Sequence, residues 1–222
     1  MANASLNNLP VVKARVQRPR LGNWSAEVVV DVATAAQLAA ASAAQLSLDG
    51  GALVFQGTVL RADVYAQLVT LRLVGGKNGL AKPCNPRFYR GSPLSRPLAD
   101  VLKDAGEVLG DGAAADDVHL EAWTQLQQLC SQALSSLAMA AGDDFVWRVL
   151  ADGTLFFGVD GFSPAQLDEY EVVDYQPLEG VQTLATEAGL VNPGDSFNGH
   201  HVSDVEHLVG DSGSRVRLWF ES

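Results

Sequence analysis

Three of the four histidines fall in one segment near the C-terminus, beside acidic side chains that could complete a metal site. His200, His201 and His207 share this segment with Asp204 and Glu206. If the segment is a β-strand, alternate residues face opposite sides, so His201 and His207 lie on one face about 20 Å apart. Two ligands cannot bind one ion across that distance. The spacing predicts no metal site and favours surface histidines on a hairpin, or histidines buried at a subunit contact.

The residues needed for nucleophilic or phosphate chemistry lack the spacings that such chemistry requires. The sequence has no GxSxG motif, and Cys84 and Cys130 form neither a CxxC pair nor a Cys/His setting. The glycine-rich run at 75–79 (GGKNG) has neither the ending of a P-loop nor a GxGxxG pattern. We therefore expect no catalytic residues, no cofactor and free thiols.

Carboxylates are the one type of catalytic side chain present in quantity. The possible members of a hydrolase pair in one acidic stretch are Asp160, Asp168, Glu169, Glu171 and Asp174. Any acidic protein offers such pairs by chance, so an acidic-site hydrolase is only the minor alternative.

Composition excludes several classes of protein. The 222 residues include 26 acids and 15 bases, a net charge of −11, whereas specific nucleic-acid binding draws on clustered Lys and Arg. Hydrophobic residues make up 47 %, enough for a folded core in one large domain or two small ones. No apolar run approaches the roughly 20 residues that cross a bilayer, and the N-terminus lacks a signal-peptide pattern. We expect no membrane insertion and synthesis in a cytoplasm.

The basic residues are unevenly distributed. They gather at 13–20 and at 77–96, whereas acids dominate 100–117 and 160–187. Solvated loops are the simpler interpretation. The alternative is a pair of complementary patches that dock copies of the protein head to tail.

The first third of the chain has the alternation and β-branched content of strands. We expect strands at 11–17, 24–31, 52–61 and 64–74, with turns at 19–23 and 62–63. The Ala-rich stretch at 33–46 has no strong apolar stripe, so it is a short helix or a loop. This pattern predicts a first β-barrel module over residues 1–76.

The middle of the chain, 77–142, reads as a loop followed by a helical insertion. The stretch at 75–95 is rich in Gly and Pro and predicts a loop. Apolar spacing predicts a helix over 97–109, opened by Pro97 and closed by Gly110. A second helix is expected over 117–141, with Asp116 or Asp117 as its N-cap.

The last third, 143–222, returns to strands. They are expected at 145–150, 154–159, 169–175, 180–186, 201–208 and 214–220, with turns at 151–153 and 210–213. We predict a mostly β (α+β) fold in which two small antiparallel β-barrel modules flank the helical insertion. A Phe-x-Gly triplet at Phe55 and again at Phe197 leaves duplication of one module open.

A resemblance to a known family rests on stretches that span most of the chain. They are 90–102 (RGSPLSRPLADVL) with 105–107, 146–155 (VWRVLADGTL), and 192–195 with 199–207 (GHHVSDVEH). These stretches, and the order of the modules, resemble the baseplate hub proteins of tailed bacteriophages, in particular the compact hubs of Mu-like and related phages and prophages.

The resemblance implies a structural virion protein of the phage tail, assembled in the host cytoplasm and without catalysis of its own. It implies a homotrimer whose six small β-barrels adapt the hexameric tail tube to the trimeric central spike. Our candidates for interface positions are Arg87, Arg90 and Arg96 in the basic loop, and Phe55 and Phe197 at strand starts. The alternatives are a hexameric tail tube or distal-tail β-barrel protein and, less favoured, the acidic-site hydrolase.

Overall fold

The N-terminal third of the chain is a set of antiparallel strands. A computed structural model describes residues 4–38, 43–111, 118–165, 167, 170–185, 191–210 and 213–221. The first elements are β1 (Ala4–Leu6), β2 (Leu9–Pro10), β3 (Lys13–Pro19), β4 (Ser25–Asp31), α1 (Val32–Leu38), β5 (Ala43–Leu48), the 3-10 turn η1 (Asp49–Gly51), β6 (Leu53–Tyr65) and β7 (Leu68–Gly75). Buried and exposed residues alternate along β3 and β4, which is why the sequence pattern predicted both strands correctly.

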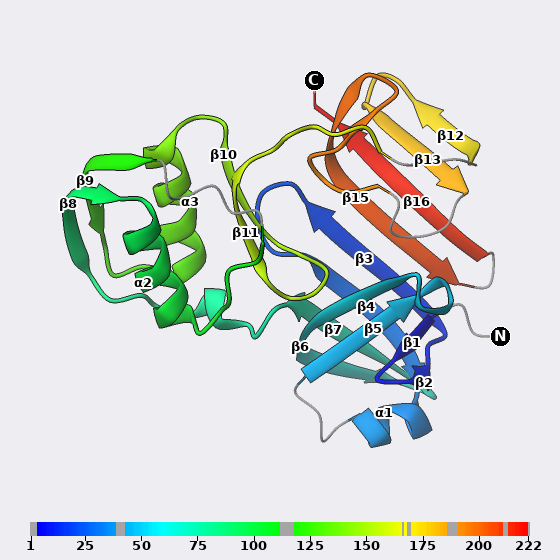
Figure 1. Ribbon diagram of the computed structural model, residues 1–222. Helices are drawn as coiled ribbons and strands as arrows, with labels where there is room; N and C mark the ends of the chain where they lie inside the picture. The colour runs from blue at the N-terminus through cyan, green and yellow to red at the C-terminus, as the bar shows by residue number, and fades with distance from the viewer. Residues whose placement is uncertain are drawn as a thin grey trace.

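The middle of the chain forms a layer of two helices against a two-stranded ribbon (Figure 1). Its elements are the 3-10 turn η2 (Gly79–Ala81), β8 (Arg87–Pro93), α2 (Ser95–Ala105), β9 (His119–Gln125) and α3 (Cys130–Ala141). Helix α2 buries the predicted apolar face, including Leu98 and Val101. It ends at Gly106 and not at Gly110, because Gly106 adopts the left-handed conformation, with φ of 76°, that stops a helix.

The prediction of one helix over 117–141 is wrong in its first half. The segment His119–Gln125 is β9, which pairs with β8. Leu120 and Trp123 are spaced as on a helix and both are buried, but the cross-strand partners decide their conformation. For the same reason the predicted loop over 75–95 is wrong where β8 forms. The expected N-cap residues, Asp116 and Asp117, lie outside the described residues.

The hairpin of β6 and β7 turns later than predicted. Strand β6 continues through Ala62 and Asp63, and the turn falls at Ala66 and Gln67. Ala66 has a φ of 52°. The sequence gives no reason to expect this left-handed conformation at an alanine, because Gly, Asn and Asp are the residues that usually adopt it.

The last third contains the expected strands. They are β10 (Phe145–Val149), β11 (Leu155–Val159), β12 (Glu171–Gln176), β13 (Val181–Ala185), β14 (Ser196–Phe197), β15 (His200–Gly210) and β16 (Gly213–Phe220). Strands β10 and β11 form the predicted hairpin, and β15 pairs with β16 as expected.

One antiparallel sheet of twelve strands combines two β regions (Figure 1). The N-terminal β region is β1–β7, and the C-terminal β region is β12–β16. The strand order of the sheet is β12-β13-β16-β15-β3-β4-β7-β6-β5-β1-β2, with β14 paired to β15. The two regions meet where residues 204–209 of β15 pair with residues 14–19 of β3. The mostly β class is confirmed. The pairings of the described strands form an open path, so no closed barrel is found and the two-barrel arrangement stays a prediction.

Two apolar clusters form the core. The larger contains Trp24 and Phe55 and extends from the N-terminal strands through α2 and α3 to β10 and β11. The smaller contains Val205 and Leu218 in the C-terminal β region. The division into 1–76, 77–142 and 143–222 stays a prediction. Within the described part of the chain, no helix has the length and apolar character to span a membrane.

Candidate functional site

A row of arginines crosses the outer face of the central sheet. Successive cross-strand partners from β16 to β6 are Arg215, Leu208, Arg15, Glu27, Arg72 and Arg61. Residues paired across an antiparallel ladder point to the same face, so these guanidinium groups share it. The opposite face carries core residues such as Val16 and Val28.

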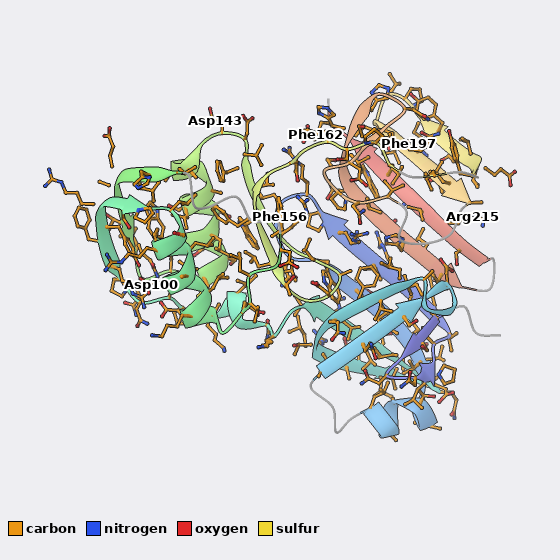
Figure 2. The ribbon with its side chains drawn as sticks, viewed as in Figure 1. Asp100, Asp143, Phe156, Phe162, Phe197 and Arg215 are labelled. Carbon is orange, nitrogen blue, oxygen red and sulfur yellow. The ribbon has the colours of Figure 1, made fainter. Side chains whose placement is uncertain are left out.

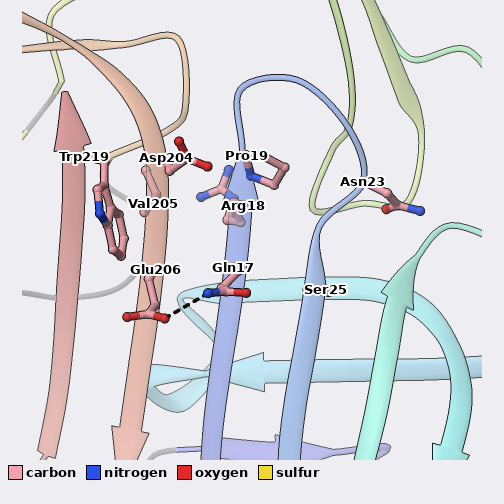
Figure 3. A pocket seen from close by; sticks show the side chains of 9 residues that line it. All are labelled: Gln17, Arg18, Pro19, Asn23, Ser25, Asp204, Val205, Glu206 and Trp219. Atoms are coloured by element: carbon pink, nitrogen blue, oxygen red, sulfur yellow. Dashed lines mark hydrogen bonds between the residues drawn. The ribbon is translucent and has the colours of Figure 1, made fainter. Parts of the chain in front are cut away.

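The neighbouring row centres on a buried carboxylate, Glu206, whose side chain is 1 % exposed. It accepts a hydrogen bond of 3.3 Å from Gln17 Nε2 (Figure 3). It also accepts hydrogen bonds from Arg15 Nε and, at 3.2 Å, from Arg217 Nη1. A buried charge is costly unless it is paired and hydrogen-bonded, and these partners meet that need. Glu206 therefore holds β15, β3 and β16 together through these side-chain contacts.

Two adjoining concavities hollow this outer face. The first, of about 340 Å³, is lined by Gln17, Arg18, Pro19, Asn23, Ser25, Asp204, Val205, Glu206 and Trp219 (Figure 3). The second, of about 270 Å³, shares Gln17 and Ser25 with the first and extends to Arg72. We call the surface that carries Arg15, Arg61, Arg72, Arg215 and Arg217 the arginine face. Guanidinium forks of this kind bind carboxylate or phosphate groups.

On the core side of the sheet, Arg18 and His207 meet where the two β regions join. Arg18 Nη1 lies 3.4 Å from His207 Nε2, and Arg18 Nη2 donates to Asn192 Oδ1 at 2.7 Å. Burial, with a smaller contribution from Arg148, lowers the pKa of Arg18 to about 10. Burial and then the charge of Arg18 hold the pKa of His207 well below its ordinary value. At neutral pH the imidazole is uncharged and its Nε2 accepts from Arg18.

Asp160, one of the possible hydrolase carboxylates, is the centre of a buried ion-pair network. Its side chain is 2 % exposed, and Oδ2 accepts a hydrogen bond of 2.6 Å from Arg20 Nε. Oδ1 accepts a hydrogen bond of 2.7 Å from Arg148 Nη1, and Arg20 also pairs with Glu221. Because Arg20 follows β3 and Arg148 lies in β10, Asp160 connects the N-terminal strands to the β10–β11 hairpin.

The other acids of that stretch do not join Asp160 in a site. Glu171 and Asp174 lie on β12, whose residues are all exposed. Asp168 and Glu169 lie outside the described residues. The acidic stretch therefore supplies one buried structural carboxylate and an exposed acidic strand.

The prediction that His201 and His207 share a face is wrong. The pairing of β15 with β16 shifts register between Val202 and Asp204, and such a bulge changes the phase of alternation. His207 consequently turns inward and packs 6.0 Å from the ring of Phe55, whereas His201 stays exposed. Within the described residues, no group of three or more His, Cys, Asp or Glu side chains could hold a metal ion.

The three candidate interface arginines all lie in the helical layer but have different surroundings. Arg87 donates to both carboxylate oxygens of Asp104, at 2.6 and 2.8 Å. These hydrogen bonds hold the pKa of Asp104 below its usual range. Arg87 thus fastens β8 to α2. Arg90 and Arg96 are exposed, and no ion pair involves either of them in the part of the chain that the structure describes.

The two candidate phenylalanines are buried within the chain. Phe55, in β6, packs 5.2 Å from the ring of Trp24 in the larger apolar cluster. Phe197, in β14, packs 5.2 Å from the ring of Tyr170 in the C-terminal β region (Figure 2). Both side chains fill cores, and a part for either in subunit contacts stays a prediction.

Sequence reasoning missed the arginine face, although a signal for it was present. Arg15 and Gln17, like Arg215 and Arg217, alternate with apolar residues that become buried or partly buried. That period of two places each pair on one face of its strand. The pattern does not predict that β15 pairs with β3 or that β4 pairs with β7. These two pairings place the arginines side by side.

Solved structures of other proteins share this fold over nearly the whole chain. A 43 kDa tail protein of prophage MuSo2 from Shewanella oneidensis has a TM-score of 0.69 and 9 % identity, over 98 % of this chain and 96 % of that one. A tail protein from Neisseria meningitidis MC58 has a TM-score of 0.71 and 10 % identity, over 99 % and 96 %. The chain has the fold of prophage tail proteins.

A third structure with this tail-protein fold comes from a secretion system. The Escherichia coli c3393 protein is described as a component of the type VI secretion system with structural similarity to the T4 bacteriophage tail proteins gp27 and gp5. Its TM-score is 0.63 at 9 % identity, over 99 % of this chain and 77 % of that one. The sequence matches no protein-family model and no curated protein.

Proposed function

We propose that this chain is a structural subunit of a phage tail, the baseplate hub, which acts as a homotrimeric adaptor between the tail tube and the central spike. The observation that carries the proposal is the arrangement of the two β regions. Along the sequence they flank the helical layer, and in space they join through the pairing of β15 with β3. Prophage tail proteins share this fold.

Symmetry explains why such an arrangement suits an adaptor. A ring of three chains, each with two β regions, presents six β units, so one side can meet a sixfold tube and the other a threefold spike. The two β regions play the part of the two barrel modules in this proposal. The similarity of the Escherichia coli protein to gp27 and gp5 supports the same placement.

A non-catalytic role follows from the state of the buried acids. Glu206 and Asp160 are each bound by two arginines. In each case the carboxylate oxygens are occupied by structural partners, which supports a structural part for both acids. In the proposed function these groups hold the two β regions in a fixed relation within the virion tail.

Light scattering on the purified chain over a concentration series tests the proposal. A homotrimer of the 23.5 kDa chain, seen by electron microscopy as a ring with threefold symmetry, is the expected result. A hexamer would instead favour a tail tube or distal-tail protein. A chain that stays monomeric at every concentration would overturn the proposed homotrimer.

A further inference from the structure

Strand β12 is an open edge, exposed on both faces within the described part of the chain. It ends the twelve-stranded path and, among the described strands, pairs with β13 alone. All six of its residues are exposed, including Val172, Val173 and Tyr175, the last of them 55 % exposed. An exposed apolar edge is a template for pairing with another chain, and proteins ordinarily cover or guard it.

The negative charge of β12 limits which strand of another chain can pair with it. Glu171 and Asp174 lie on β12 without an ion pair in the described part of the chain, and the sequence has no Lys or Arg between Arg148 and Arg215. Pairing of β12 with β12 in a second copy would bring these acids together, which opposes a twofold contact. The partner edge should therefore be basic.

One other long edge of the chain meets this requirement. Strand β8 pairs only with β9 among the described strands. Strand β8 carries the exposed residues Arg90 and Phe88, the second of them 66 % exposed, and Leu126, directly after β9, is 61 % exposed. More exposed bases, Arg96 and Lys103, lie on the adjoining α2.

The other edges fit less well. Residues 59–65 of β6 pair only with β7 among the described strands, but they carry the acid Asp63 beside Arg61. Strand β2, at the far end of the sheet, has two residues and ends in Pro10, so it cannot support a ladder. Strand β9 carries the exposed acid Glu121 and no base other than His119. Strands β10 and β11 already form isolated bridges, to Gly22 and to Leu109 respectively.

We propose that β12 of one chain adds to the open edge of β8 in a second copy, so that copies join head to tail. This contact rests on the proposed function, which sets the number of copies in the ring. The six residues of β12 match the seven of β8, a ladder of about 20 Å at 3.3 Å per residue. The two strands lie at opposite ends of the molecule (Figure 1). A contact between different surfaces at opposite ends generates a closed ring or a filament.

Charge reversal tests the contact on the full chain. Arg90→Glu, the double variant Glu171→Lys with Asp174→Lys, and the combination of all three are compared by sedimentation over a concentration series. Each separate reversal should weaken self-association about tenfold or more, and the combination should recover most of that loss because opposite charges again face each other. Lys13→Glu is the matched control, since Lys13 is an exposed strand base outside both the contact and the arginine face, and it should leave association unchanged.

Hydrogen exchange adds a readout of the ladder itself. Amides of 171–176 and 87–92 should exchange more slowly in the assembled protein than in dilute monomer, because open-edge amides gain partners. Assembly without this protection, or assembly insensitive to Arg90→Glu, overturns the contact but leaves a trimeric hub standing. A charge-sensitive, protected hexamer would support the contact and overturn the trimer. A permanent monomer overturns both.

Discussion

Asp160 Oδ1 accepts a 2.7 Å hydrogen bond from Nη1 of Arg148, in a network whose carboxylate is almost fully buried. The second oxygen of Asp160 binds Arg20, which follows β3. One carboxylate thus connects the β10–β11 hairpin to the place where the two β regions meet. Its hydrogen bonds to two guanidinium groups give Asp160 a structural role.

Replacing this carboxylate should destabilise the fold strongly. Asp160→Asn removes the charge, so Arg148 loses its anion and Arg20 keeps only Glu221, and breaking a buried pair in this way costs about 3–5 kcal/mol. Urea unfolding followed by circular dichroism measures the loss. Asp63→Asn is the control, because the Arg61–Asp63 pair is exposed and should contribute less than about 1 kcal/mol. Equal effects of the two substitutions would contradict the structural role of Asp160.

The close approach of Gly194 to the same carboxylate gives a second prediction. A Cβ at Gly194 would lie 2.6 Å from Asp160 Oδ1, whereas a Cβ at Gly199 meets nothing within 4 Å. The two glycines have φ of 86° and 83°, so the backbone strain of an alanine is matched. We expect Gly194→Ala to lower the free energy of unfolding by about 1–3 kcal/mol more than Gly199→Ala. Identical unfolding midpoints for the two variants would show that the network tolerates the methyl group.

The contact of Arg18 with His207 predicts a pH dependence of stability. The pKa of His207 is depressed in the folded chain, whereas an unfolded histidine titrates near pH 6.5. Below about pH 6.5 the unfolded chain binds a proton at His207, whereas the folded chain leaves this imidazole neutral. The free energy of unfolding therefore decreases progressively as the pH falls. His207→Gln should flatten the fall in unfolding free energy between about pH 6.5 and pH 5. The exposed His119→Gln should keep the slope of the parent chain; a parent slope retained in His207→Gln would contradict the burial of this histidine.

The bidentate pair between Arg87 and Asp104 predicts that even the conservative substitution of Arg87 by lysine lowers the stability of the fold. Lysine keeps the charge but cannot span both carboxylate oxygens, so Arg87→Lys should cost about 1–2 kcal/mol of unfolding free energy. Arg90→Lys, on the exposed face of the same strand, should change thermal stability little. If both variants melt together with the parent chain, the pair does not fasten β8 to α2.

Local patterns were sufficient for elements whose conformation depends on their own residues. Alternation along 13–19 and 25–31 predicted β3 and β4, and the Asp-Gly turn at 151–153 predicted the β10–β11 hairpin. Periodic apolar positions predicted α2. In each case the signal lies within a few residues of the element that it describes, so chain geometry alone makes it readable.

Tertiary structure decided what depends on partners distant in sequence. Residues 119–125 have a helix-like apolar spacing, yet pairing with β8 makes them a strand. His207 turns inward because a bulge in β15 shifts the phase of alternation, and its partner Arg18 comes from the other β region. The arginine face exists only because β15 pairs with β3 across most of the chain length. Such pairings depend on which edges meet in the folded core, and no single segment of the sequence carries that information.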